Sequence, residues 1–360
     1  VVIAYTDGGN SSYGTAVVFA VASTNNTSFI GITDQAIANT ASGSVIVQGG
    51  VNSKLTSLTI GADYYVQTDG SIDAGATSIP YDISSAAYTQ NFSVSSQDTS
   101  PQGLAFSPDG TKMFMVGYAD DKVFQYALST AFDISTASYS SIYFSVSAQE
   151  TIPRGLAFSV DGGKMFVLGT TADQVFEYTL SSAFNVSTAS FVDAFSVAAQ
   201  ETDPQGIAFS TDGAKMFITG HTGQDVNEYA LSTVFDVSTA SYTQNFSISG
   251  QETQPTGIAF NSVGTKMFII GVTGQDVNEY TLSTGFNVST ASFSGITFSV
   301  ATQETSPQAI VFNATGTNFY VLGASGDDIN QYATTQTTFV TTVKAGQAIS
   351  ATTINMKDLT

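Results

Sequence analysis

The stretch QDTSPQGLAFSPDGTKMFMVGYADDKVFQYALSTAFDISTASYSSIYFSVS, residues Gln97 to Ser147, decides the fold, because the chain holds five copies of it. The prolines that open the copies are spaced by 52, 51, 51 and 52 residues. They are Pro101, Pro153, Pro204, Pro255 and Pro307. A fixed period of this length is typical of a repeat architecture.

Each copy predicts four strands. Its segments are short, rich in Phe, Val, Tyr and Ile, and bounded by Gly, Asp and Ser, whereas helical periodicity is not convincing in any of them. In the first copy we expect strands at Gly103–Ser107, Lys112–Gly117, Lys122–Leu128 and about Tyr139–Val146. About fifty residues that hold four antiparallel strands form one blade of a β-propeller.

The number of strands predicts how the ring closes. The first three strands occur five times, but the fourth is missing after the last copy. PYDISSAAYTQNFSVS (Pro80–Ser95) matches FDVSTASYTQNFSIS (Phe235–Ser249) almost letter for letter, so the missing strand precedes the repeats. We therefore predict an all-β chain with a closed five-bladed propeller over residues 79–333, whose N-terminal strand completes the last blade and leaves no free edge.

The two flanks are predicted to form a second domain. Residues 1–78 and 334–360 are rich in Thr, Ser, Ala, Val and Gly. The chain enters and leaves the ring at the same corner, which favours one small β domain built from both flanks, with the propeller inserted into it. We expect this domain to serve attachment or assembly.

Composition excludes several function classes. Nine Lys and Arg against 29 Asp and Glu give a formal charge of −20, which argues against nucleic-acid partners and a polybasic membrane anchor. The absence of Cys excludes disulfides and thiolate metal sites, and a single His removes most His-based catalysis. No stretch approaches the ~18 apolar residues of a membrane helix, so membrane insertion is not expected.

Acidic residues give the main candidate site. One acid per blade lies in Q-D/E-T-x-P, and further acids lie in the loops between the second and third strands, all expected to face outward around the mouth of the channel. Two alternatives follow: a ring that binds a cation, with Ca²⁺ as the candidate cofactor, or another ligand; or caps that hydrogen-bond the adjacent turns. The candidates are Asp98, Glu150, Glu201, Glu252, Glu304, Asp121, Asp173, Asp225, Asp276 and Asp328.

Other repeated and unique residues have simpler interpretations. Arg154, the only Arg, either pairs with these acids or contacts a ligand, and His221 is expected to be an exposed loop residue. The Gly of the turn after the first strand, as in Asp109-Gly110, indicates a positive φ. The Lys after this turn, as in Lys112, is expected to be solvated, and the Tyr that ends each third strand, as in Tyr126, to be core.

The repeat units SPDGTKMFMVG (residues 107–117) and LSTAFDISTASY (residues 128–139) resemble repeats of tail-fibre and other virion-surface proteins of bacteriophages, often marine ones. The flanking segments Phe29–Ser71 and VKAGQAISATTINMK (Val343–Lys357) are similar to a module of the same proteins. The resemblance implies a place on a virion surface or outside the cell. It brings no catalytic residues, because its motifs are structural.

Together these observations predict a non-enzymatic virion-surface protein for structure or adhesion, such as a tail fibre, spike or capsid decoration. Expected partners are other virion proteins or further copies of the chain through the small domain, and a host-surface glycan or protein. The alternatives are a bacterial surface or filament protein, a lectin-like propeller, and a five-bladed glycosidase. The last is disfavoured because near-identical blades give no acid a distinct role.

Overall fold

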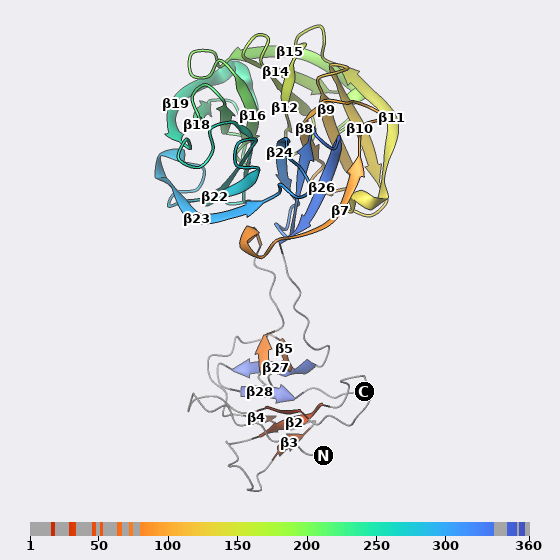
Figure 1. Cartoon of the computed structure of the whole chain (residues 1–360), viewed down its shortest axis with the longest axis vertical. Helices are drawn as coiled ribbons and strands as arrows, with labels where there is room; N and C mark the ends of the chain where they lie inside the picture. Colours follow the sequence, from red (N-terminus) through yellow and green to blue (C-terminus); the bar gives the residue numbers. More distant parts are fainter. Residues whose placement is uncertain are drawn as a thin grey trace. The chain divides into compact units, whose positions relative to one another are not determined.

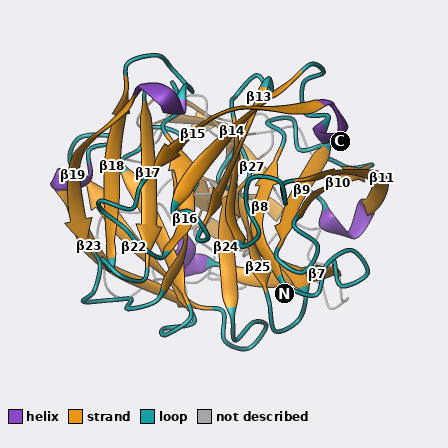
Figure 2. Cartoon of the chain, turned by 90° about the horizontal axis from the view of Figure 1, so that it is seen from above, coloured by secondary structure: helices purple, strands orange, loops and turns teal. Residues whose placement is uncertain are grey.

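The computed structural model describes residues 80–334 throughout and, outside that range, only the strands β1–β6, β27 and β28. Residues 80–334 form a ring of five four-stranded antiparallel sheets (Figure 1, Figure 2). In each sheet the strands are neighbours in the order in which they occur along the chain, except in the fifth sheet. The all-β, five-bladed propeller predicted from the repeats is confirmed.

The first four blades are continuous in sequence. Blade one contains β8 (Pro101–Phe106), β9 (Lys112–Gly117), β10 (Lys122–Leu128) and β11 (Ala137–Ser145). Blade two contains β12 (Pro153–Phe158), β13 (Lys164–Gly169), β14 (Gln174–Leu180) and β15 (Ala189–Ser196). Blade three contains β16 (Pro204–Phe209), β17 (Lys215–Gly220), β18 (Asp225–Leu231) and β19 (Ala240–Ser247). Blade four contains β20 (Pro255–Phe260), β21 (Lys266–Gly271), β22 (Asp276–Leu282) and β23 (Ala291–Ser299).

The fifth blade joins the two ends of the propeller. It contains β24 (Pro307–Phe312), β25 (Asn318–Gly323), β26 (Asp328–Ala333) and, from the N-terminal side, β7 (Ala87–Ser93). β7 pairs antiparallel with β26, with Phe92 opposite Ile329 and Tyr88 opposite Tyr332 (Figure 1). The predicted closure is therefore confirmed in its register.

Aromatic side chains fill the space between neighbouring blades. The ring in the middle of each second strand packs on the Phe that ends the next blade's first strand, with ring centroids 4.5–4.6 Å apart. Phe114 contacts Phe158 in this way, and Tyr320 of blade five contacts Phe106 of blade one. The Tyr near the end of each third strand is fully buried, as predicted: Tyr126, Tyr178, Tyr229, Tyr280 and Tyr332.

Polar contacts also join the blades, and they correct our expectation for the lysines. Lys112 Nζ donates to the Phe184 carbonyl of the next blade (2.9 Å), and Lys164, Lys215 and Lys266 make the same kind of contact. These lysines are thus half-buried links between blades, not solvated side chains. In blade five Asn318 replaces the Lys, and the Tyr320 hydroxyl donates to the Phe132 carbonyl instead (2.6 Å).

The turns explain most differences from the predicted strand bounds. Each first strand begins at its Pro, and each fourth strand follows a short 3-10 turn that we did not predict, directly in blades one to four and after one residue in blade five. Asp or Asn caps each turn; Asp133, for example, accepts from the Ser135 N–H (3.1 Å). The turns are η1 (Ile83–Ser85), η2 (Ile134–Thr136), η3 (Val186–Thr188), η4 (Val237–Thr239) and η5 (Val288–Thr290). The predicted positive φ is present at Gly110 (69°), where a Cβ would meet the Phe132 ring.

The chain divides into two compact units: Val1–Ser78 with Thr337–Thr360, and the propeller unit Ile79–Gln336. A three-stranded sheet contains β1 (Ala16–Val18), β2 (Phe29–Thr33) and β3 (Val45–Val47). The other sheet draws strands from both flanks, in the order β4 (Val51–Asn52), β28 (Thr353–Met356), β27 (Lys344–Ser350), β5 (Asp63–Val66) and β6 (Ile72–Ala74).

The boundary differs slightly from the predicted one. We assigned Thr334 to the flank, but its N–H donates to the Thr317 carbonyl of blade five (2.8 Å). No helix in the described part of the chain is long and apolar enough to cross a membrane.

Candidate functional site

The five repeated acids bind the loop that precedes each first strand to the loop that follows each second strand. Glu201 Oε1 accepts from the N–H groups of Asp203 (2.8 Å) and Thr222 (3.1 Å), and Oε2 accepts from the Gly223 N–H (2.8 Å). The other four acids make contacts of the same kind: Asp98, Glu150, Glu252 and Glu304. All five are at most 3% exposed.

This contact also explains why Gly ends each second strand. A Cβ on Gly220 would lie 2.6 Å from Glu201 Cδ, which is closer than real Cβ contacts allow. The acid and the Gly therefore recur together in each blade because the acid side chain packs on the Gly.

The geometry favours the capping alternative over a cation ring. The five acids are not exposed at the mouth of the channel, and our expectation of an outward-facing negative ring is wrong. Backbone N–H groups stabilise these buried carboxylates, although Glu150 Oε2 is covered and has no hydrogen-bond partner among the described residues. No group of three or more His, Cys, Asp or Glu side chains suited to a metal occurs among the described residues.

Three of the acids at the loops between the second and third strands each have their own hydrogen-bond partners. Asp225 Oδ1 accepts from Asn227 Nδ2 (2.7 Å), and Asn245 Nδ2 donates to the other oxygen. Asp276 and Asp328 also accept from Asn side chains. Burial raises the pKa of all three, because it disfavours the charged carboxylate.

Asp121 and Asp173 have left-handed backbones, with φ of 52° and 50°. One carboxyl oxygen of each is covered and has no hydrogen-bond partner among the described residues. Burial is the main cause that raises their pKa, and neighbouring carboxylates add to it. They lie on separate blades and form no shared site.

Blades two and three break the symmetry of the ring. His221 Nδ1 lies 3.0 Å from Asp203 Oδ2, and Gln205 Nε2 donates to the other carboxyl oxygen of Asp203. His221 is thus a half-buried partner of Asp203, not a simple exposed loop residue. The charged neighbour of His221, the only His of the chain, is Asp203, and no other blade has an acid at the position of Asp203.

Arg154 lies at the start of β12 and makes no ion pair within 4 Å in the described part of the chain, against one of our two alternatives for it. Its Nη1 donates to Gln102 Oε1 (2.7 Å), whereas Nε is covered and has no partner there. Burial lowers the pKa of Arg154, and the charge of Asp203 is the strongest influence in the opposite direction. Asp203 therefore contacts His221 and acts electrostatically on Arg154, which are the only His and the only Arg of the chain.

Asp203 is the residue that sequence reasoning missed. We compared the repeated acids, which are alike, and concluded that no acid stands apart. The position before the Pro holds Ser100, Ile152, Gln254 and Ser306 in the other blades. A comparison of what differs between blades identifies Asp203, Arg154 and His221 together.

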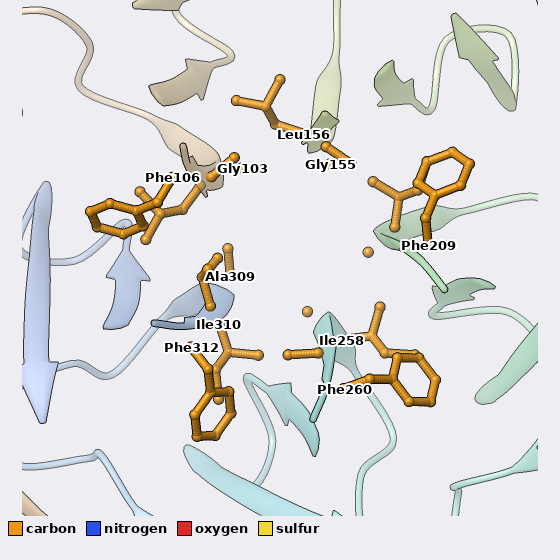
Figure 3. Close-up of a pocket in the computed structure, with 18 of the residues that line it drawn as sticks. Gly103, Phe106, Gly155, Leu156, Phe209, Ile258, Phe260, Ala309, Ile310 and Phe312 are labelled. Carbon is orange, nitrogen blue, oxygen red and sulfur yellow. The ribbon is translucent and has the colours of Figure 1, made fainter. Parts of the chain in front are cut away.

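A cavity of about 460 Å³ occupies the channel inside the ring, and the first strands of all five blades line it (Figure 3). Sites for small organic ligands have volumes of this order. One end is formed by the second residue of each first strand: Gln102, Arg154, Gln205, Thr256 and Gln308. Among the residues that line the cavity, Arg154 alone is charged.

Comparisons with known proteins show the fold. No family model matches the chain, and no curated protein matches it. A putative 6-phosphogluconolactonase from Bacteroides uniformis is similar at 14% identity and a TM-score of 0.40, over 66% of this chain and 65% of that one. The periplasmic gluconolactonase of Pseudomonas aeruginosa is similar at 15% and 0.40, over 71% and 70%. A luciferin-regenerating enzyme is similar at 13% and 0.43, over 68% and 94%.

These comparisons correct our functional expectation. Three of the similar structures bear the name of a gluconolactonase or a putative 6-phosphogluconolactonase, against our expectation of a non-enzymatic virion-surface protein, and we withdraw that expectation. This chain covers 53–65% of the first structures that it matches. At such identities the likeness shows the propeller fold alone, so an activity has to be argued from the site. The phage resemblance, the partners and the location remain predictions.

The loop contacts of the acids give a stability prediction. Glu201→Ala leaves three backbone N–H groups without their acceptor, so the free energy of unfolding should fall by about 3 kcal/mol. Denaturant unfolding measures this, with Asp120→Ala as the matched control, because Asp120 is exposed and should change stability by less than about 0.5 kcal/mol. A melting temperature that rises with Ca²⁺ in the wild type and not in Glu201→Ala would instead support the cation ring.

Proposed function

We propose that this protein is a small-molecule-binding propeller that takes an organic carboxylate in its central channel. The observation that carries the proposal is the guanidinium of Arg154, the one charge on the wall of the cavity, with a covered Nε that has no partner among the described residues. A polar group that is covered without a hydrogen bond costs free energy, which a shift of the side chain toward a ligand oxygen would recover.

The chemistry of Arg favours a carboxylate over other acceptors. A guanidinium presents parallel N–H groups that match the two oxygens of a carboxylate. Nη1 gives one N–H to Gln102, so its second N–H and the two of Nη2 remain for a carboxylate, and the covered Nε can join them only when the side chain shifts. The amide nitrogens of Gln205 and Gln308, at the same end of the cavity, already donate to Asp203 and Ser306, so Arg154 is the main donor there.

The repeat itself provides the test variant. Gln stands at the position of Arg154 in blades one, three and five, so Arg154→Gln restores the common blade sequence and should fold. Wild type should bind hexanoate and bind hexanamide much more weakly. Arg154→Gln should lower hexanoate affinity about 10- to 100-fold, since hydrogen bonds to charged groups are worth ~1.5–3 kcal/mol. Isothermal titration calorimetry measures both.

Equal affinity of wild type and Arg154→Gln for hexanoate would overturn the proposal, as would the absence of binding by wild type. Gln308→Ala serves as a control at the same end of the cavity. It should change hexanoate affinity by less than about fivefold, because the Gln308 amide is neutral and donates to Ser306.

A second candidate function is hydrolysis of an ester or lactone, and one observation favours it. His221 and Asp203 form a pair in which Asp203 can hold the imidazole in one tautomer, with Nδ1 protonated and Nε2 unprotonated. Nε2 is covered and has no hydrogen-bond partner among the described residues, so it can accept a proton from a water molecule only when the loop around it opens. General-base activation of water is the reaction such a pair performs.

This candidate predicts turnover of p-nitrophenyl acetate or δ-valerolactone by wild type. Asp203→Ser and His221→Thr install residues that other blades carry at these positions, and each should lower kcat/KM about 100-fold or more. Val272 is the residue of blade four that corresponds to His221, and Val272→Thr should leave the rate unchanged. Hydrolysis that is absent, or equally fast in all three variants, would contradict the candidate.

A further inference from the structure

We infer that the ligand of this channel is amphipathic, with its carboxylate at Arg154 and an unbranched aliphatic chain along the axis of the ring. The inference rests on the proposed carboxylate site and extends it to a substrate class. It is carried by the shape and the composition of the cavity walls beyond the Arg154 end.

Aliphatic side chains surround the middle of the cavity. Each first strand contributes one branched residue, 3–8% exposed, to the lining: Leu104, Leu156, Ile207, Ile258 and Ile310. Ala105, Ala157, Ala259 and Val311 lie one position further along their strands and also line the cavity. Transfer of methylene groups from water to such surroundings is favourable.

The cavity is also narrow and extended. Five first strands of six residues each surround it, which gives walls of ~20 Å at the usual rise per residue. Figure 3 shows the labelled residues around an open centre, with the phenyl rings of Phe106, Phe209, Phe260 and Phe312 turned away from it. The open space thus follows the axis of the ring, which suits a chain better than a broad ring system.

The charge of Arg154 determines the orientation of the ligand in the channel. Arg154 is at the end where the first strands begin, and the residues that line the other end, at the turns after the first strands, are neutral. These include Ser107, Thr211, Asn261 and Asn313. An amphipathic acid therefore gains an ion pair only with its head at Arg154, and its chain then extends toward the turns.

The test is a chain-length series of straight carboxylates from butyrate to dodecanoate, below their micelle concentrations, titrated by calorimetry. Affinity should rise about three- to fourfold per methylene until the chain fills the channel, which is the fold-change that methylene burial gives. The heat capacity change on binding should become more negative along the series.

A variant with a narrower channel tests the aliphatic part of the site. The triple variant Ala105→Val, Ala157→Val and Ala259→Val installs the residue that blade five carries as Val311 and narrows the channel away from Arg154. It should bind butyrate within twofold of wild type and dodecanoate about tenfold more weakly. Ala127→Val, on the exposed side of β10, is the control and should change neither affinity.

The outcomes separate the two claims. Affinity that is independent of chain length, with butyrate binding still lost in Arg154→Gln, overturns the aliphatic channel and leaves the carboxylate site intact. The same conclusion follows if the triple variant binds dodecanoate as tightly as wild type does. Carboxylate affinities that stay at the wild-type level in Arg154→Gln along the whole series overturn the proposed function, because the head group then contributes nothing.

Discussion

The pairing of β7 with β26 is the interaction on which the rest of the propeller depends. It takes a strand from before the repeats and places it at the end of the last blade, so that every outer strand has a partner. Closure brings blade five against blade one, where Tyr320 packs on Phe106 and bonds the Phe132 carbonyl. The central channel exists because the ring is closed, and its walls are the first strands that closure holds side by side.

Much of the fold could be predicted from the sequence because the blade is a local unit that recurs. The second and third strands have the predicted bounds, since Gly and polar turns mark both of their ends. The 3-10 turns escaped prediction because Asp133 and its counterparts act through side-chain caps, which hydrophobic periodicity does not show. The lysines were placed wrongly because their acceptors, such as the Phe184 carbonyl, belong to the next blade.

The candidate site was less predictable, for a related reason. Repetition drew attention to residues that every blade shares, and Glu201 and its counterparts recur because they bind the loops together. Function in a symmetric ring has to come from departures from the repeat. Asp203 and His221 are 18 residues apart in sequence, and their contact becomes visible only when strands β16 and β17 are paired. The covered Nε of Arg154 likewise follows from packing and not from composition.

A crystal structure of the protein grown with decanoate tests the central claim most directly, that the channel is an amphipathic site headed by Arg154. The account predicts the carboxylate within hydrogen-bond distance of the Arg154 guanidinium and the aliphatic chain between the first strands, directed toward the turns that follow them. Decanoate bound outside the ring, or a channel that holds only water at saturating decanoate, would contradict it.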